Sequence, residues 1–373
     1  MNLGQLLILK VDELRWNSSL ERFLRRLQPG GVVIDAPLTG GAGAGREFLT
    51  NVACAVPTAP FLALREEGGV MDPLGAFLPA LPSPRAVAGK GLAAVRRLGE
   101  LVGAAFEFLG FNTDLAPLLD LAPPDAGKST CEPVESRSPT LRRVPTVEAA
   151  ATRAFSPDPQ QMANCGAAFL DGLERHEVRA CGKHFPGLAG AQSSSVNGLP
   201  LVSKSMAQLW REDLVPYRAL LPRLPFVLVS TASYKAYDFD FLQCAGLSPK
   251  VVEGLLRTKL SYDGIAIACG LETKAVRGTL TLEEAAVQAL GAGCDMLLLE
   301  ETAAAERVPA ALRTARESGK LPSPRLEQAL ERIQLAKQGL RAPAGQPSRG
   351  SLAKLSMDFR AFSAACAGGN NFD

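Results

Sequence analysis

The chain has 373 residues, 47% of them hydrophobic, and a formal net charge of +2 at pH 7. This length and composition are enough to bury one large core, which excludes a mainly disordered chain. No basic run stands out, so we expect no nucleic-acid partner and no binding to a membrane surface.

The first element that the sequence predicts is a strand in the apolar run 6–11. Lys10, Asp12 and Glu13 interrupt this run long before it reaches the length of a membrane span, and no basic region precedes it. We therefore expect a strand rather than an export signal. Eight scattered cysteines without a C-x-x-C pair, in a chain with two histidines, predict free thiols in a reducing cytoplasm, no metal site and no other cofactor.

Short apolar runs suited to buried parallel strands recur along the chain, separated by segments of helical periodicity. The runs are 6–11, 31–36, 60–65, 112–121, 179–185, 226–231, 264–269 and 295–300. Clear amphipathic segments include 92–110, 158–176, 281–294 and 323–340. Eight alternating units favour an α/β fold of the closed (β/α)8 TIM-barrel type over an open doubly wound sheet.

Two segments depart from this alternation. Residues 122–152, rich in Pro, Ser and charge, follow the fourth strand on the face where barrel enzymes build their sites; a lid and a tolerated insertion both fit. We predict a barrel over residues 1–341. Residues 342–373 then form a linker and a short C-terminal helix, with apolar side chains at 352, 355, 359 and 362.

Six short motifs occur in one order along the predicted strands. They are LREEGG (64–69), LAPLLDL (115–121), TRAFSPDP (152–159), GKHFPG (182–187), YDGIAIACGLETKAV (262–276) and AGCDMLLL (292–299). In these motifs the sequence resembles glycoside hydrolase family 3 over roughly residues 1–340, in particular its bacterial single-barrel β-N-acetylglucosaminidases (β-hexosaminidases). The resemblance implies a barrel that acts on amino-sugar glycosides.

The chain departs from the family at both catalytic elements. The resemblance implies an aspartate nucleophile just past the seventh strand, where this chain has Cys269 and Gly270. It also implies a histidine acid/base on the loop after KHFPG, where the same register gives Ser194 and Val196. Retaining hydrolysis needs a carboxylate at the anomeric carbon and a proton donor for the leaving oxygen. We therefore predict a pseudoenzyme that is inactive or severely impaired.

The resemblance also implies which residues contact the sugar. Lys183, His184 and Arg153 match family residues that hold the sugar in the first subsite, and Asp120 stands at a strand end. Arg65 occupies the position of an aspartate that accepts a hydrogen bond from a sugar hydroxyl. A guanidinium only donates hydrogen bonds, so this part of sugar recognition is altered.

Each surviving residue also has a structural interpretation. Lys183 and His184 could brace the barrel mouth through hydrogen bonds to Asp120 or Glu67, and Arg153 could pair within the 122–152 segment. The Gly68–Gly69 pair predicts a turn with positive φ. The acids left near the mouth are expected to be solvated or ion-paired; they are Glu66, Glu67, Glu272 and Glu300.

Three functions stay open at this point. The chain could be a pseudo-glycosidase that still binds an amino sugar or another glycoside. It could be a scaffold that binds a protein partner through residues 122–152 or the C-terminal helix. It could also be an active O-glycosyl hydrolase of β-N-acetylhexosaminidase or β-glucosidase type, with relocated carboxylates such as Glu66 or Glu300 acting with Asp120.

Overall fold

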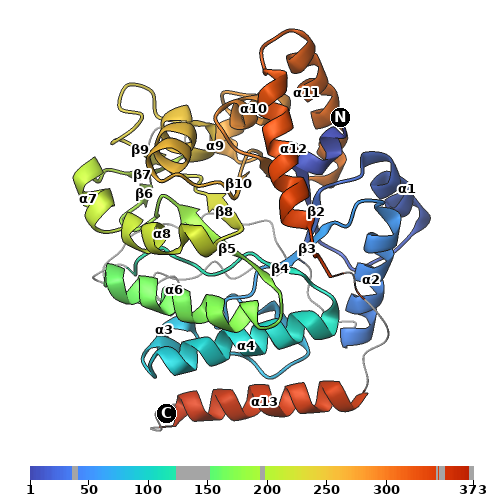
Figure 1. The fold of residues 1–373 in the computed structure, drawn as a ribbon, viewed down its shortest axis with the longest axis vertical. Helices are drawn as coiled ribbons and strands as arrows, with labels where there is room; N and C mark the ends of the chain where they lie inside the picture. Colours follow the sequence, from blue (N-terminus) through green and yellow to red (C-terminus); the bar gives the residue numbers. More distant parts are fainter. Residues whose placement is uncertain (36–40, 123–151, 194–197, 342, 344–348, 369–373) are drawn as a thin grey trace.

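The computed structural model describes residues 1–35, 41–122, 152–193, 198–341, 343 and 349–368. Eight parallel strands close into a barrel, and β11 pairs with β1 to complete it (Figure 1). In barrel order the strands are β1 (Leu7–Val11), β2 (Gly31–Ile34), β3 (Phe61–Leu64), β4 (Thr113–Asp114), β5 (Arg179–Phe185), β8 (Phe226–Val229), β10 (Ile265–Ala268) and β11 (Met296–Leu299). The predicted (β/α)8 barrel and its eight strands are confirmed.

The apolar runs form strands because each one is covered on both sides. Every residue of β3, β8, β10 and β11 is buried, half of them pointing into the barrel and half toward the helices. Neighbouring strands are parallel around the whole barrel, as in β1 with β2, where Ile8 pairs with Gly31, and β3 with β4, where Ala63 pairs with Thr113. All carboxyl ends of the strands therefore meet at one rim, which we call the mouth.

Helices surround the barrel, and their ends carry the expected caps. Asp158 caps α6 with Pro159 as its first residue, and Thr281 with Glu284 forms a capping box at α10. The longer helices are α1 (Ser18–Leu27), α2 (Gly41–Ala55), α4 (Leu92–Leu109), α6 (Pro159–Glu174), α8 (Leu214–Leu220), the π-helical η6 (Lys250–Lys259), α10 (Leu282–Gly291), α11 (Arg307–Glu317) and α12 (Ser323–Lys337). The shorter ones are η1 (Leu3–Leu6), η2 (Pro73–Ala76), α3 (Pro84–Ala88), α7 (Met206–Arg211), η4 (Leu221–Arg223), η5 (Ala245–Leu247), α9 (Lys274–Arg277) and η7 (Thr302–Glu306).

The amino ends of the strands are held together by a buried ion cluster. Asp295, just before β11, is fully buried and accepts hydrogen bonds from Arg325 at 2.7 Å and Arg332 at 3.2 Å. Arg257 of η6 donates to the other carboxylate oxygen. One carboxylate thus ties η6 and α12 to the barrel floor.

Two features lie outside the barrel. A small sheet in the order β6-β7-β9 sits near the mouth; its strands are β6 (Gln192–Ser193), β7 (Pro200–Val202) and β9 (Ser233–Tyr234). Helix α13 (Arg349–Ala367) runs beside α4 (Figure 1). Its buried face includes Phe359 and Phe362. It has 19 residues and is longer than the short helix that the sequence predicts.

None of the helices in the described part of the chain combines the length and apolar character that a membrane crossing requires. The 122–152 segment, for which a lid and an insertion were both open, lies almost entirely outside the described residues.

Candidate functional site at the barrel mouth

One side of the mouth carries a network of ion pairs between the first, second, third and eighth barrel strands. Lys10 Nζ lies 2.8 Å from Glu300 Oε2 and 3.5 Å from Asp35 Oδ2. Arg65 lies 3.6 Å from each of the same two carboxylates. Asp12 adds a third carboxylate, 3.3 Å from Lys10. We call Lys10, Asp35, Arg65 and Glu300 the mouth ion network; each of its four charges faces opposite charge.

The other side of the mouth is built on Glu67, which is 3% exposed. Arg153 donates to both of its oxygens, at 2.8 and 2.7 Å, and Lys183 Nζ lies 2.5 Å from Oε1. Lys183 also donates to the Leu115 carbonyl. Burial alone would raise the pKa of Glu67, but the charges of Arg153 and Lys183 outweigh it and hold that pKa well below its usual range.

These contacts bear on the structural interpretations of Lys183 and Arg153. The bracing contact expected for Lys183 with Glu67 is present. Arg153 pairs with Glu67, next to the third strand, whereas its expected contact within the 122–152 segment falls almost entirely outside the described residues. The bidentate geometry explains this, because a planar guanidinium matches a carboxylate better than a single loop carbonyl would.

His184 and Asp120 form a second polar pair at the mouth. His184 Nδ1 lies 2.7 Å from Asp120 Oδ2, and Asp120 Oδ1 accepts the backbone N–H groups of His184 at 3.2 Å and Leu188 at 2.9 Å. The imidazole is 21% exposed, and its Nε2 has no hydrogen-bond partner among the described residues. Asp120 therefore fixes the orientation of the ring, and no described residue bonds to its second nitrogen.

The position past the seventh barrel strand offers no anion. Cys269 Sγ donates to the Val229 carbonyl at 3.3 Å, and burial strongly raises the pKa of this thiol. Gly270 has φ of +67°, and a Cβ there would collide with the Thr231 side chain. The thiol stays protonated and the next position has no room for a side chain. The predicted acid/base positions, Ser194 and Val196, lie outside the described residues.

Glu66 cannot serve as a relocated catalytic acid in this arrangement. It is fully buried, and its two oxygens accept backbone N–H groups from Gly68 at 2.7 Å and Leu74 at 3.1 Å. Burial, and then the charge of Asp72, raise its pKa well above the usual value. The expectation of a solvated or ion-paired Glu66 is wrong, because the carboxylate folds the LREEGG turn around itself.

Glu272 has a similar supporting role, which corrects the same expectation for it. Its oxygens accept the backbone N–H groups of Glu300 at 2.7 Å and Glu301 at 2.9 Å.

The predicted turn at Gly68 and Gly69 is confirmed, with φ of +81° and +61°. A Cβ on Gly69 would lie 2.8 Å from the Ser83 Cα, so the turn needs glycine there for two reasons.

Sequence reasoning missed two buried acids that support the mouth. Asp114 at the end of β4 is fully buried and accepts the Glu66 backbone N–H at 3.0 Å. Asp213, also buried, lies 2.5 Å from Lys204 Nζ and sits so close to Gly187 that a Cβ there would come within 2.5 Å of its own Cβ. A charged residue inside an apolar strand was the available signal for Asp114. No comparable signal marked Asp213.

The space beside the mouth ion network is small. The described residues enclose a cavity of about 60 Å³ between β2 and the turn after β3, lined by Asp35, Arg65 and Met71 among others. Sites for small molecules typically measure about 300–1,000 Å³. No group of three or more His, Cys, Asp or Glu side chains in the described part of the chain is placed to hold a metal ion.

Comparisons with known proteins agree with the fold and the motif order. A family model described as the glycosyl hydrolase family 3 N-terminal domain matches residues 138–336, more than half of the chain. A β-hexosaminidase from Pseudomonas aeruginosa is 29% identical over 305 residues, which cover 80% of this chain and 83% of that protein.

Two solved structures show the same architecture. A family 3 glycosyl hydrolase from Mycobacterium smegmatis has a TM-score of 0.75 at 25% identity and covers 91% of this chain and 97% of its own. The β-N-acetylglucosaminidase from Thermotoga maritima has a TM-score of 0.76 at 24% identity, over 91% of this chain and 68% of its own. The chain belongs to glycosyl hydrolase family 3, with β-hexosaminidase-type ancestry.

Proposed function

We propose that this family 3 barrel binds an amino-sugar glycoside without hydrolysing it. One observation carries the proposal: the residue past the seventh barrel strand is a half-buried thiol, Cys269, which donates to the Val229 carbonyl and is followed by a glycine without room for a side chain. A retaining glycosidase needs a carboxylate at this position to stabilise the positive charge that develops on the anomeric carbon.

The surrounding charges support the loss of activity. Arg65 places a cation near Cys269, where it opposes a developing oxocarbenium ion. Glu300 is engaged by Lys10 at 2.8 Å and faces Arg65 at 3.6 Å, and Glu66 has no exposed atoms. An active hydrolase with relocated acids would need one of these carboxylates to leave its present partners and face the sugar.

Retained binding is supported by the pair of His184 and Asp120. The hydrogen bond that Asp120 accepts from the imidazole holds the ring in one orientation before a ligand arrives, which lowers the entropy that binding would cost. Arg153, 21% exposed beside Glu67, offers a second donor group. Together they present oriented polar groups to sugar hydroxyl or acetamido oxygens.

We also propose a reducing, cytoplasmic and bacterial setting. The cysteines of the described residues are all free thiols, and five of the seven are buried. Free buried thiols are typical of reducing compartments. The β-hexosaminidase relative named above comes from the bacterium Pseudomonas aeruginosa.

The test combines binding and turnover on the same preparation. Titration calorimetry with N-acetylglucosamine and muropeptide fragments should show saturable binding that His184→Ala weakens at least about 10-fold and that His176→Ala, remote from the mouth, leaves unchanged. An aryl β-N-acetylglucosaminide should not be hydrolysed. Failure to bind any sugar would leave a scaffold for protein partners, and turnover abolished by Glu300→Gln would establish a relocated active site.

A further inference from the structure

The segment between β9 and η5 presents the most exposed aromatic side chains of the described residues. Phe239 is 78% exposed and Phe241 is 70% exposed, with the exposed Asp240 between them. We call residues 239–241 the Phe tip. Two large apolar side chains held in water beside each other are typical of an interaction surface.

The Phe tip projects from an anchored base. Asp238, directly before it, is 5% exposed and accepts a hydrogen bond from Gln243, two residues beyond the segment, at 3.4 Å. The Asp238 backbone N–H donates to the Tyr234 carbonyl at 3.0 Å. The rings are therefore displayed by a fixed turn, which reduces the entropy lost when they dock.

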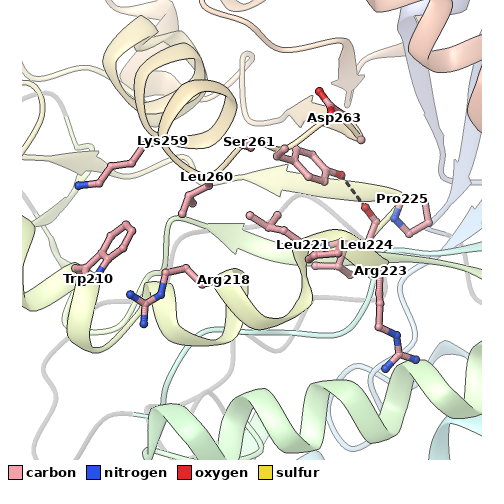
Figure 2. A pocket seen from close by; sticks show the side chains of 13 residues that line it. Trp210, Arg218, Leu221, Arg223, Leu224, Pro225, Lys259, Leu260, Ser261 and Asp263 are labelled. Atoms are coloured by element: carbon pink, nitrogen blue, oxygen red, sulfur yellow. Dashed lines mark hydrogen bonds between the residues drawn. The ribbon is translucent and has the colours of Figure 1, made fainter.

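A large hollow lies at the opposite end of the barrel. It measures about 780 Å³ and is formed where the chain enters β8 and β10, next to α7 and the ends of α8 and η6 (Figure 2). We call it the rear groove; its lining includes Trp210, Arg218, Leu221, Leu224, Lys259 and Tyr262. Its volume falls within the range of about 300–1,000 Å³ that is usual for binding sites.

One end of the rear groove carries two cations without acidic partners. The Arg218 guanidinium and the Lys259 ammonium each lie 4.5 Å from the centre of the Trp210 ring. Figure 2 shows these three side chains together at one end of the groove. Neither forms an ion pair with any described residue. Arg223, further along, is already paired with Asp171 and Glu174 at 2.8 and 2.9 Å. Asp263 lies at the far end from Trp210. The Trp210 end of the groove is therefore positively charged.

We propose that the Phe tip of one copy of this chain docks into the rear groove of a second copy. The groove offers the half-buried side chains of Trp210 and Leu260 for the two phenyl rings, and, for Asp240, two cations that no described residue pairs. The chain carries both halves of this complementary pair, which favours a second copy over an unrelated acidic peptide.

The topology determines the form of the assembly. The Phe tip follows the carboxyl end of β8, whereas the rear groove is built from residues just before β8 and β10. The two surfaces lie at opposite ends of one barrel, so a chain cannot fill its own groove. Association is head-to-tail, and each added copy leaves one tip and one groove open.

Sedimentation velocity on the full chain tests this proposal, which is independent of sugar binding. From about 10 to 300 µM protein, the weight-average mass should rise with concentration, and added salt should reduce the rise, as for a small, charged interface. The double variants Phe239→Ser/Phe241→Ser and Arg218→Glu/Lys259→Glu should each weaken association at least about 10-fold. Met357→Ser, which replaces an exposed apolar side chain elsewhere (67% exposed), should associate like the parent.

Mixing the two double variants gives the decisive result. The tip variant keeps an intact groove and the groove variant keeps an intact tip, so an equimolar mixture should form dimers that do not grow further. All substituted side chains are on the surface or groove lining, and unchanged melting temperatures would show that the variants fold. A monomer at every concentration, association that either double variant leaves intact, or a mixture without dimers would overturn the proposal; the last would leave the groove to an acidic partner of another kind.

Discussion

The Arg65 guanidinium lies 3.6 Å from Glu300 Oε1, joining the ends of the third and eighth barrel strands across the mouth. The same Glu300 accepts a hydrogen bond from Lys10 at 2.8 Å. A carboxylate between two cations is a poor nucleophile, because its negative charge is already compensated. Glu300 is thus an acidic residue of the mouth whose charge is already compensated by two cations.

Restoring the missing anion should restore part of the chemistry. Cys269→Asp places a carboxylate past the seventh strand, and a dinitrophenyl β-N-acetylglucosaminide has a leaving group that needs no proton. We expect release of dinitrophenol at least about 10-fold above the parent protein, whereas a poor leaving group should still fail because general-acid help, about 10²–10⁴-fold, is absent. Cys269→Asn is the matched uncharged control. Equal rates for the two variants would show that the position does not face the anomeric carbon.

Glu67→Gln should destabilise the barrel strongly. The change leaves Lys183 buried, at 3% side-chain exposure, without the carboxylate that it shares with Arg153. Removing one partner of a buried ion pair costs about 3–5 kcal/mol of unfolding free energy, measurable by urea denaturation. Glu306→Gln, which breaks a surface pair with Arg26, should change stability by about 0.5 kcal/mol or less. Similar losses in both variants would contradict the central role of Glu67.

Lys337 should make the unfolding free energy depend on pH in the neutral to alkaline range. Its Nζ donates to Gln5 at 2.7 Å and lies 5.2 Å from the Phe61 ring centre, and burial lowers its pKa from 10.5 to about 7. Between these two values the unfolded chain binds more protons than the folded chain. The unfolding free energy should therefore rise with pH from about 7 to about 10.5, by up to about 5 kcal/mol.

Lys337→Met should remove that rise and should be more stable than the parent near pH 7. Lys354→Met, at an exposed position on α13, is the control and should follow the parent curve. Urea denaturation at several pH values compares the three proteins. Parallel curves for the parent and Lys337→Met would show that Lys337 is solvated and ordinary.

We propose that residues 1–341 form the folding unit and that α13 is an addition to it. A chain that ends at Arg341 should keep its far-ultraviolet circular dichroism apart from the lost helix. Its unfolding free energy should fall by several kcal/mol, since burial of each large apolar side chain such as Phe359 and Phe362 contributes about 1.5–3 kcal/mol. Phe359→Ala in the full chain should lose part of that stability, and Met357→Ala almost none. An unfolded truncated chain would make α13 part of the core.

The barrel was predictable because its strands are buried on both faces and therefore appear as continuous apolar runs. Runs such as GIAIAC and DMLLLE have this character, and both coincide with strands. The small β6-β7-β9 sheet was not predicted, because two- and three-residue strands leave no periodicity to detect. The length of α13 was underestimated, since only its buried residues showed the helical spacing.

The sequence predicted which residues lie at the mouth better than it predicted which of them are in contact. The sequence placed Lys183, His184 and Asp120 at strand ends, and the structure brings His184 and Asp120 together. It did not predict that Arg153 would cross to Glu67, because a long-range ion pair leaves no local pattern. Glu66 was misjudged for a related reason: a carboxylate that binds its own turn through backbone N–H groups looks in sequence like a solvated one.

The proposal that this barrel does not cleave glycosides is tested most directly by a hydrolysis assay at high concentration of pure protein. With an aryl β-N-acetylglucosaminide and an aryl β-glucoside as substrates, we expect no more released phenol than with heat-denatured protein. Steady turnover that Glu300→Gln abolishes, while Glu306→Gln does not affect it, would contradict the account and show that the barrel has a working acid in a new place.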